Sequence, residues 1–131
     1  MHAAYNPDEI APPASRYSHA VEVRGPGRWL HVSGQIGLRP DGSLPADSEG
    51  QMEVAWTNLL AILRAAGMTA DHLVKITVFI TDPADVALVR KVRDRHIGGT
   101  PPASTLLVVA GLAHPDFRFE LEAVAAMPDG G

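Results

Sequence analysis

The chain has 131 residues, with 15 acidic against 11 basic side chains and no cysteine. This length suits one domain with one core, and the lack of cysteine excludes disulfides, thiolate catalysis and cysteine-bound metal. The net charge of −4 and the absence of a basic patch argue against a nucleic-acid partner. We therefore expect a single cytoplasmic domain over residues 1–131, with neither a signal sequence nor a membrane span.

The N-terminal part predicts an arm followed by two strands. Residues 1–16 are rich in Ala and Pro and predict an irregular segment. AVEV (20–23) and WLHVSGQIG (29–37) each have the pattern of a short strand. The turn RGPGR between them contains glycines that accept positive φ, so the two strands are predicted to form a hairpin.

Residues 49–66 predict the first helix, because their apolar side chains recur three and four positions apart. Ser48 and Gln51 have the spacing of a capping box at the start of this helix. Gly67 follows the last periodic residue and suits a left-handed position that ends the helix.

The C-terminal half alternates between strand and helix patterns. HLVKITVFI alternates with period two and predicts a strand, and TDPADVALVRKVRDRHI predicts a second helix that Asp82 or Thr81 caps. STLLVVA and FRFELEAVAAM predict two more strands, and residues 128–131 are expected to be frayed.

The order β-β-α-β-α-β-β predicts an α+β fold, with one mixed sheet and two helices on one of its faces. TLLVVA (105–110) is apolar on both of its sides, as is typical of a strand that is covered on both faces. We therefore expect a partner subunit on the second face. A strand at the centre of a monomer is the alternative.

Six segments now carry a family pattern: RYSHAV, HVSGQIG, AWTNLLAILRAAGM, LVKITVFITDPAD, PPAST and FELEAVA. In this order they resemble the reactive intermediate deaminase family, also called the RidA or YjgF family, from about Arg16 to Met127. The resemblance implies a chorismate-mutase-like fold, a homotrimer around a central barrel, and small-molecule clefts between subunits. It also implies hydrolysis of imines and enamines without a metal or organic cofactor, although some relatives are named endoribonucleases.

One position departs from the family pattern. In the deaminating members the strand reads Pro-Ala-Arg-Ser, and its Arg binds the substrate carboxylate with two hydrogen bonds. Here Pro102 and Ala103 match, Ser104 stands at the Arg, and the next residue, Thr105, is uncharged. Hydrolysis of ordinary 2-iminoacids is therefore in doubt. Ser104 either donates one neutral hydrogen bond to a ligand or is simply a small residue at a strand start.

Glu120 is the predicted catalytic residue, because it matches the glutamate that positions water in the family. Strand alternation places Arg118, Glu120 and Glu122 on one face, which is typical of a wet cleft or of an ion-pair ladder. A solvated face of exposed ion pairs is the alternative.

The predicted substrate-binding residues are Tyr17, His19, Ser33, Gly34, Ser104 and Thr105. By resemblance Tyr17 walls the cleft, and the alternative is an N-terminal anchor packed on the core. His19 replaces a glutamine more usual in the deaminases and could act as acid, base or anion contact, or be structural. Gly34 in VSGQ would let a ligand approach the backbone, and a bulge that bends the strand is the competing interpretation.

Other sequence features do not indicate a site. His2, His31 and His72 have no His or acidic partner at metal-ligand spacing, and no metal is expected. The densest basic stretch, RKVRDR (90–95), is interpreted as the solvated face of a helix.

Three functions from different classes remain. The first is a RidA-like hydrolase of imines, enamines or related reactive intermediates in an intersubunit cleft. The second is a trimeric protein that binds a small ligand without catalysis, which the serine at position 104 favours. The third is an endoribonuclease, which the acidic balance argues against, since RNA binding needs phosphate contacts from basic residues.

Overall fold

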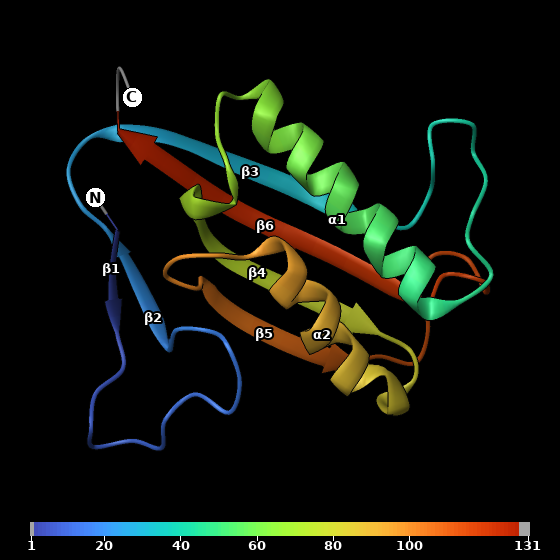
Figure 1. Ribbon diagram of the computed structural model, residues 1–131, viewed down its shortest axis with the longest axis horizontal. Coiled ribbons are helices and arrows are strands. Elements are labelled where there is room, and N and C mark those ends of the chain that lie inside the picture. Colours follow the sequence, from blue (N-terminus) through green and yellow to red (C-terminus); the bar gives the residue numbers. More distant parts are fainter. Residues whose placement is uncertain (1, 129–131) are drawn as a thin grey trace.

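The computed structural model describes residues 2–128 (Figure 1). Its strands and helices, in chain order, are β1 His2–Tyr5, β2 Ala20–Val23, β3 Gly27–Gln35, α1 Ser48–Ala65, β4 Leu73–Ile80, α2 Val86–His96, β5 Ala103–Val108 and β6 Phe119–Pro128. Two short 3₁₀ turns, Ala70–His72 and Pro83–Asp85, precede β4 and α2.

Four strands form a mixed sheet in the order β3-β6-β4-β5. β6 runs antiparallel to β3 and to β4, whereas β4 and β5 are parallel and are connected through α2. Both helices lie on one face of this sheet (Figure 1). The predicted α+β fold, with two helices on one face of a mixed sheet, is confirmed.

The core lies between the helices and this face of the sheet. Ile76, Val78 and Ile80 of β4 alternate toward the helices, and all three are buried. Full burial of such a side chain stabilises the fold by about 1.5–3 kcal/mol. The helix side of the core comes mainly from α1, through Met52, Ala55, Trp56, Leu59 and Leu63.

The start of α1 differs from the predicted capping box. Asp47 is the N-cap, and its side chain accepts a hydrogen bond from the Gly50 N–H. Ser48 instead donates to Asp85 at 2.7 Å, which ties the start of α1 to the turn before α2. The end of α1 agrees with the prediction, because Gly67 has a φ of 73° and terminates the helix.

Gln51, the other predicted capping residue, is buried and bridges loops. Its amide nitrogen donates to the carbonyls of Pro45 and Asp116 at 3.0 Å each, and its oxygen accepts from the Arg118 N–H at 2.8 Å. The prediction was wrong because the Gln51 side chain bonds Pro45 in the preceding loop and Asp116 and Arg118 far away in sequence, instead of the start of its own helix. These bonds hold the entry to β6 against α1.

The N-terminal region corrects two expectations. Residues 1–16 are not wholly irregular, since His2–Tyr5 form β1, which pairs antiparallel with β2 from His2↔Val23 to Tyr5↔Ala20. The predicted hairpin between β2 and β3 is wrong, because the two strands belong to different sheets, where β2 pairs with β1 and β3 pairs with β6. The β1–β2 pair forms a separate small sheet beside the main one (Figure 1).

The C-terminal expectation also changes at its first residue. Pro128 is the last residue of β6 and lies opposite Gly27 of β3, so it is not part of a frayed tail. The remaining residues of that expectation, 129–131, lie outside the described part of the chain.

The second face of the sheet has no helix over it within the described chain (Figure 1). Several large apolar side chains of the edge strands are exposed, namely Trp29 at 52%, Leu107 at 43% and Val108 at 51%.

Within residues 2–128, neither helix has the length and apolar character needed to cross a membrane.

Candidate functional site

A cavity of about 280 Å³ lies where the N-terminal segment, β5 and α2 meet. We call it the α2 cavity, and its lining includes Tyr17, Val89, Arg90, Arg93, Ser104 and Leu106. Residues that are far apart in the sequence thus form one small pocket. Its volume suits a small molecule.

Ser104 faces the helices, whereas Thr105 faces the other way. Ser104 lies opposite Ile76 in the β4–β5 register, and Ile76 is a core residue on the helix side. Thr105 projects from the other face of the sheet, where its hydroxyl accepts a hydrogen bond from Lys75 Nζ at 2.7 Å. The two residues therefore do not act on the same side of one subunit.

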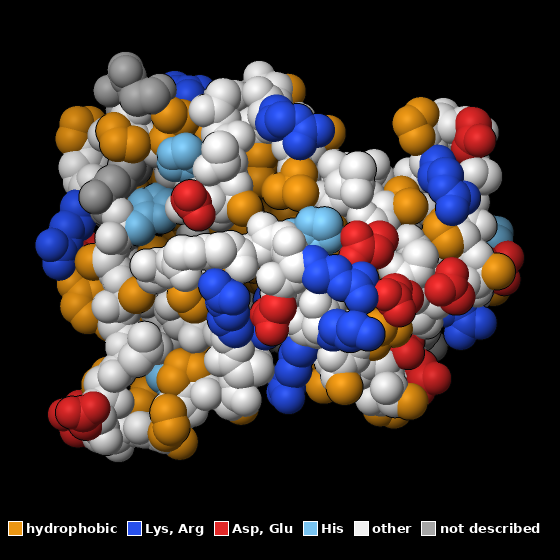
Figure 2. All heavy atoms as spheres, in the orientation of Figure 1, with side chains coloured by type: hydrophobic (Ala, Val, Ile, Leu, Met, Phe, Trp, Pro, Cys, Tyr) orange, Lys and Arg blue, Asp and Glu red, His pale blue; other side chains and the backbone are white. Residues whose placement is uncertain are grey.

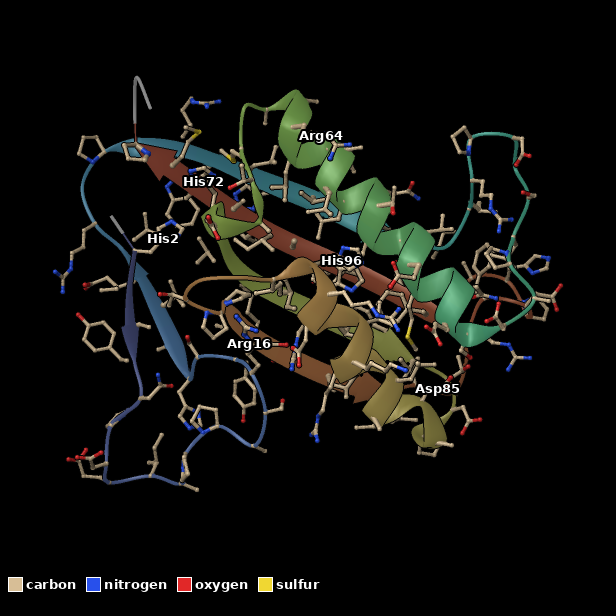
Figure 3. The ribbon with its side chains drawn as sticks, viewed as in Figure 1. His2, Arg16, Arg64, His72, Asp85 and His96 are labelled. Carbon is tan, nitrogen blue, oxygen red and sulfur yellow. The ribbon has the colours of Figure 1, made fainter. Side chains whose placement is uncertain are left out.

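The N-terminal segment is anchored beside β5, and this places Tyr17 at the cavity. Ser18 is buried, its N–H donates to Pro102 O at 3.0 Å, and its hydroxyl donates to Pro101 O at 2.5 Å. Figure 3 labels Arg16 on this segment. The Tyr17 hydroxyl accepts a 3.3 Å hydrogen bond from the Ala14 N–H. Tyr17 thus both lines the cavity and holds the segment that precedes it.

His19 is engaged within the N-terminal segment. Its Nε2 donates to Ala11 O at 2.7 Å, and its backbone N–H donates to Asn6 Oδ1 at 2.8 Å. Its ring also meets the Tyr17 ring edge-on, with the centroids 5.8 Å apart. Both the ring and the backbone of His19 are thus engaged within this segment, and His19 does not line the α2 cavity.

Two arginines of α2 line the cavity, and the sequence patterns did not single them out. Arg90 is exposed, but Arg93 is 6% exposed, so the interpretation of this stretch as a solvated face is wrong for Arg93. Arg93 Nε donates to Asp94 Oδ1 at 3.1 Å. A signal was present, because Arg93 follows Val89 by four positions and therefore shares its helix face.

α2 is held against α1 by a polar and aromatic network at its C-terminal end. His96 stacks on Trp56 at 5.7 Å and lies 3.0 Å from a Glu53 carboxylate oxygen (Figure 3). Arg95 donates to Glu53 at 2.7 Å and to Glu49 at 2.8 Å. Burial opposes ionisation of Glu53, but the hydrogen bonds from Arg95 and His96 outweigh it and hold the pKa of Glu53 below its ordinary value.

Glu120 lies on the opposite face of the sheet from the α2 cavity. It pairs in register with Phe79, on the face away from the helices. Together with Phe79, Leu112 and Ala113 it borders an open depression of about 350 Å³, which we call the Glu120 hollow. The predicted catalytic carboxylate is thus at a surface that a ligand can reach.

Gly34 is required by the close approach of Glu120. A Cβ atom at Gly34 would lie 2.7 Å from Glu120 Cδ and would overlap the carboxylate oxygen. The β3–β6 register also shifts between Val32 and Gln35, so the predicted bulge is present at Ser33 and Gly34. Ser33 is exposed, and its carbonyl accepts from Gln35 Nε2 at 3.0 Å. The bulge and the absence of a side chain at Gly34 together leave the space that the Glu120 carboxylate occupies.

The predicted site residues thus form two groups in one subunit. Tyr17 and Ser104 belong to the α2 cavity, and Glu120, Gly34 and Ser33 belong to the region of the Glu120 hollow. No three His, Asp or Glu side chains of residues 2–128 come together in a way that could hold a metal ion.

The fold and these two regions define a small α+β protein with a ligand-sized cavity at the edge of its sheet. Residues 8–127 match the family model described as Endoribonuclease L-PSP. The chain belongs to this family, which is the RidA/YjgF family.

Individual relatives agree with this assignment. The chain is 35% identical over 111 residues to the mouse 2-iminobutanoate/2-iminopropanoate deaminase, covering 83% of this chain and 79% of that protein. It superimposes on the Rid-family protein YyfB of Yersinia pestis with a TM-score of 0.87 at 30% identity, over 96% and 98% of the two chains. It also matches Escherichia coli TdcF with bound serine, with a TM-score of 0.70 at 34% identity, over 86% and 94%.

Proposed function

We propose that this protein hydrolyses imines or enamines in a cleft that forms between subunits. The observation that carries this proposal is the seating of Glu120 over Gly34 at an open hollow, in a chain of the RidA/YjgF family. The family includes relatives named as deaminases of 2-iminoacids.

The chemistry needs one water and one carboxylate. Glu120 accepts a proton from the water as its oxygen adds to the C=N carbon, and the substrate nitrogen receives a proton. The resulting carbinolamine then loses ammonia as the carbonyl group forms. The balance is one imine plus one water to one carbonyl compound plus one ammonia, and neither a metal nor an organic cofactor takes part.

A homotrimer completes the site in this proposal. The α2 cavity and the Glu120 hollow lie on opposite faces of one sheet, so one subunit cannot bring Ser104 next to its own Glu120. The exposed apolar side chains of Trp29 and Leu107 give the second face a surface that a neighbouring copy would cover. The Glu120 hollow of one subunit would then meet the α2 cavity of the next, with Thr105 and Ser33 near that boundary.

The substrate in this proposal is not a 2-iminoacid whose carboxylate is bound by an arginine of β5. Ser104 provides one neutral hydroxyl where a bidentate cation would be needed to bind a carboxylate from β5. The substrate therefore either lacks an α-carboxylate or has its anionic group bound by another element.

A non-catalytic ligand-binding protein is the second candidate, because a cavity is present and the strand cation is absent. An endoribonuclease activity, which the family name suggests, has less support. Figure 2 shows Lys and Arg side chains interspersed with Asp and Glu on the visible face, without a broad basic surface for phosphates.

The test is an imine-hydrolysis assay in which an amino-acid oxidase generates 2-iminoacids and an amine oxidase generates imines without a carboxylate. We expect accelerated ammonia release from one of the two sets, which shows whether the substrate carries a carboxylate, and a loss of about 10²–10⁴-fold in Glu120→Gln. Glu9→Gln is the matched control, because Glu9 is exposed and lies in neither region. If the wild-type protein accelerates neither set, the protein is not an imine hydrolase, and the binding-protein candidate replaces it.

A further inference from the structure

We propose that Arg93, assisted by Arg90, binds a ligand carboxylate inside the α2 cavity. The charge that is missing from β5 at Ser104 is then supplied from the facing helix. The inference names the substrate class of the proposed reaction and rests on that function for its catalytic meaning, but the carboxylate site itself can be measured without any turnover.

Arg93 is a buried cation with hydrogen-bonding capacity to spare. Its Nε is bonded to Asp94, whereas its Nη2 is buried and has no hydrogen-bond partner among the described residues. An unpaired buried donor on a charged group is costly. Arg93 also lines the cavity, so we infer that its guanidinium turns toward a ligand there and pairs with it. A guanidinium presents its donors in a planar fork, which matches the two oxygens of a carboxylate.

The rest of the cavity fits a small anion with a short apolar body. Val78, Val89 and Leu106 provide an apolar wall, and Ser104 and Tyr17 provide neutral polar groups. None of the residues that line the cavity is acidic, and Asp94, whose carboxylate is bonded to Arg93 Nε, is not part of the lining. Arg90 adds a second, exposed cation to the lining.

The same geometry explains how a ligand carboxylate can be accepted without an arginine on the strand. Ser104 and Arg93 line one cavity from different elements, one from β5 and the other from α2. A small residue at position 104 leaves room for an anion that is bound from the helix. We infer a compact carboxylate whose anionic group lies toward α2, with its reactive carbon directed away from that helix.

The first measurement is calorimetric titration of the wild-type protein with 2-oxobutanoate, with neutral butanone and with inorganic phosphate. We expect binding of 2-oxobutanoate and none of butanone. Arg93→Met should weaken 2-oxobutanoate binding by about ten- to a hundred-fold, as expected for loss of hydrogen bonds to a charged group. Arg90→Gln should weaken it by about two- to five-fold, because an exposed charge contributes less.

Lys91→Gln is the matched control, since it removes the same charge from an exposed position of α2 that does not line the cavity. It should leave the affinity within about two-fold of wild type. Arg93→Lys keeps the charge without the fork and should bind with intermediate affinity. Wild-type affinity in Arg93→Met, or equal losses in Lys91→Gln and Arg90→Gln, would overturn the proposal. So would phosphate binding as tight as that of 2-oxobutanoate, which would indicate a general anion site.

Thermal unfolding without ligand separates a binding role of Arg93 from a structural one. Replacing a buried, incompletely paired cation by an apolar side chain of similar length should leave the Tm unchanged or raise it. Adding 2-oxobutanoate should then raise the Tm of the wild-type protein and not that of Arg93→Met. A lower Tm of ligand-free Arg93→Met would instead assign Arg93 to the core of the fold.

The two proposals can fail separately. If the wild-type protein binds 2-oxobutanoate through Arg93 but hydrolyses no imine, the carboxylate site stands and the proposed reaction falls. If it hydrolyses imines, and Arg93→Met hydrolyses carboxylate-bearing and neutral imines at wild-type rates, the reaction stands and the carboxylate site falls.

Discussion

The α2 cavity and the Glu120 hollow differ in how the chain builds them. The hollow depends on a contact between two neighbouring strands, where Glu120 of β6 lies directly against Gly34 of β3. The α2 cavity is assembled from three separate segments, namely the N-terminal arm, β5 and α2. In the first arrangement, any side chain at position 34 would displace the Glu120 carboxylate. The second can receive the same chemical group from a different element.

This difference explains which functional groups can be supplied from another position in the chain. A residue with a Cβ at position 34 would displace the Glu120 carboxylate from its position, because that Cβ would overlap it. A cation for the cavity, by contrast, can come from the strand or from the helix that packs opposite it. Ser104 and Arg93 lining one cavity are consistent with such an exchange.

The largest expected effect is a loss of imine hydrolysis when the Glu120 hollow is altered at Gly34. Gly34→Ala places a methyl group where the Glu120 carboxylate lies, so Glu120 must change rotamer and lose its position. We expect imine hydrolysis to fall by about 10²-fold or more, similar to loss of a general base. The measurement is the oxidase-coupled assay, together with carboxylate titration. The titration should be little affected, because the groups proposed to hold the carboxylate line the α2 cavity and not the Glu120 hollow.

Gly98→Ala is the matched control for this variant. Nothing lies within 4 Å of a Cβ at Gly98, and that residue belongs to neither region. It should keep wild-type activity. Full activity in Gly34→Ala would show that Glu120 does not need its position over the bulge, and would remove the main support for its catalytic role.

A smaller effect is expected at the anchor of β6. Gln51→Leu leaves the Arg118 N–H and two loop carbonyls without their partner while keeping the side-chain volume similar. We expect a loss of about 1–3 kcal/mol in the free energy of unfolding, measured by urea denaturation. Hydrolysis should decline more than carboxylate binding, since Gln51 positions the strand that carries Glu120. Equal declines of both would show that the anchor serves the whole fold.

The smallest expected effect is on the pH dependence of stability, through the contacts of Glu53 in α1 with Arg95 and His96 in α2. The pKa of Glu53 is lower in the folded protein than its ordinary value of 4.5, so its charged form favours folding. This stability is present above the unfolded-state pKa and is lost as the pH falls through the lower folded-state pKa. Glu53→Gln should therefore flatten the acid limb of the stability curve by less than about 1 kcal/mol. An unchanged acid limb would show that the contacts of Glu53 with Arg95 and His96 do not stabilise the fold.

Local patterns predicted much of the fold because they report burial directly. The alternation in β4 placed Ile76, Val78 and Ile80 on one face, and the structure buries all three. Gly67 ended α1 as expected, because a left-handed residue there needs no knowledge of the rest of the chain. The family pattern in turn directed attention to Glu120 and Gly34, which the structure places in contact.

Long-range partners could not be predicted in the same way. Gln51 had the spacing of a capping residue, but its side chain bonds the loop before α1 and Asp116, which is 65 residues away. β2 looked like one half of a hairpin, but its partner is a four-residue strand at the N-terminus. In both cases a local rule competed with a tertiary contact that satisfies more hydrogen bonds.

By itself, the sequence determined the α+β class, the positions of the helices and the main strands, the family, and the absence of an arginine at position 104. These properties follow from periodicity and from residue identity, which are local. Only the tertiary structure decided that Ser104 and Thr105 lie on opposite faces, and that Arg93 is buried in a cavity wall. The reason is physical: whether a charged side chain on a helix meets water or a cavity depends on what packs against that helix, and strand β5 and the N-terminal segment are remote from Arg93 in sequence.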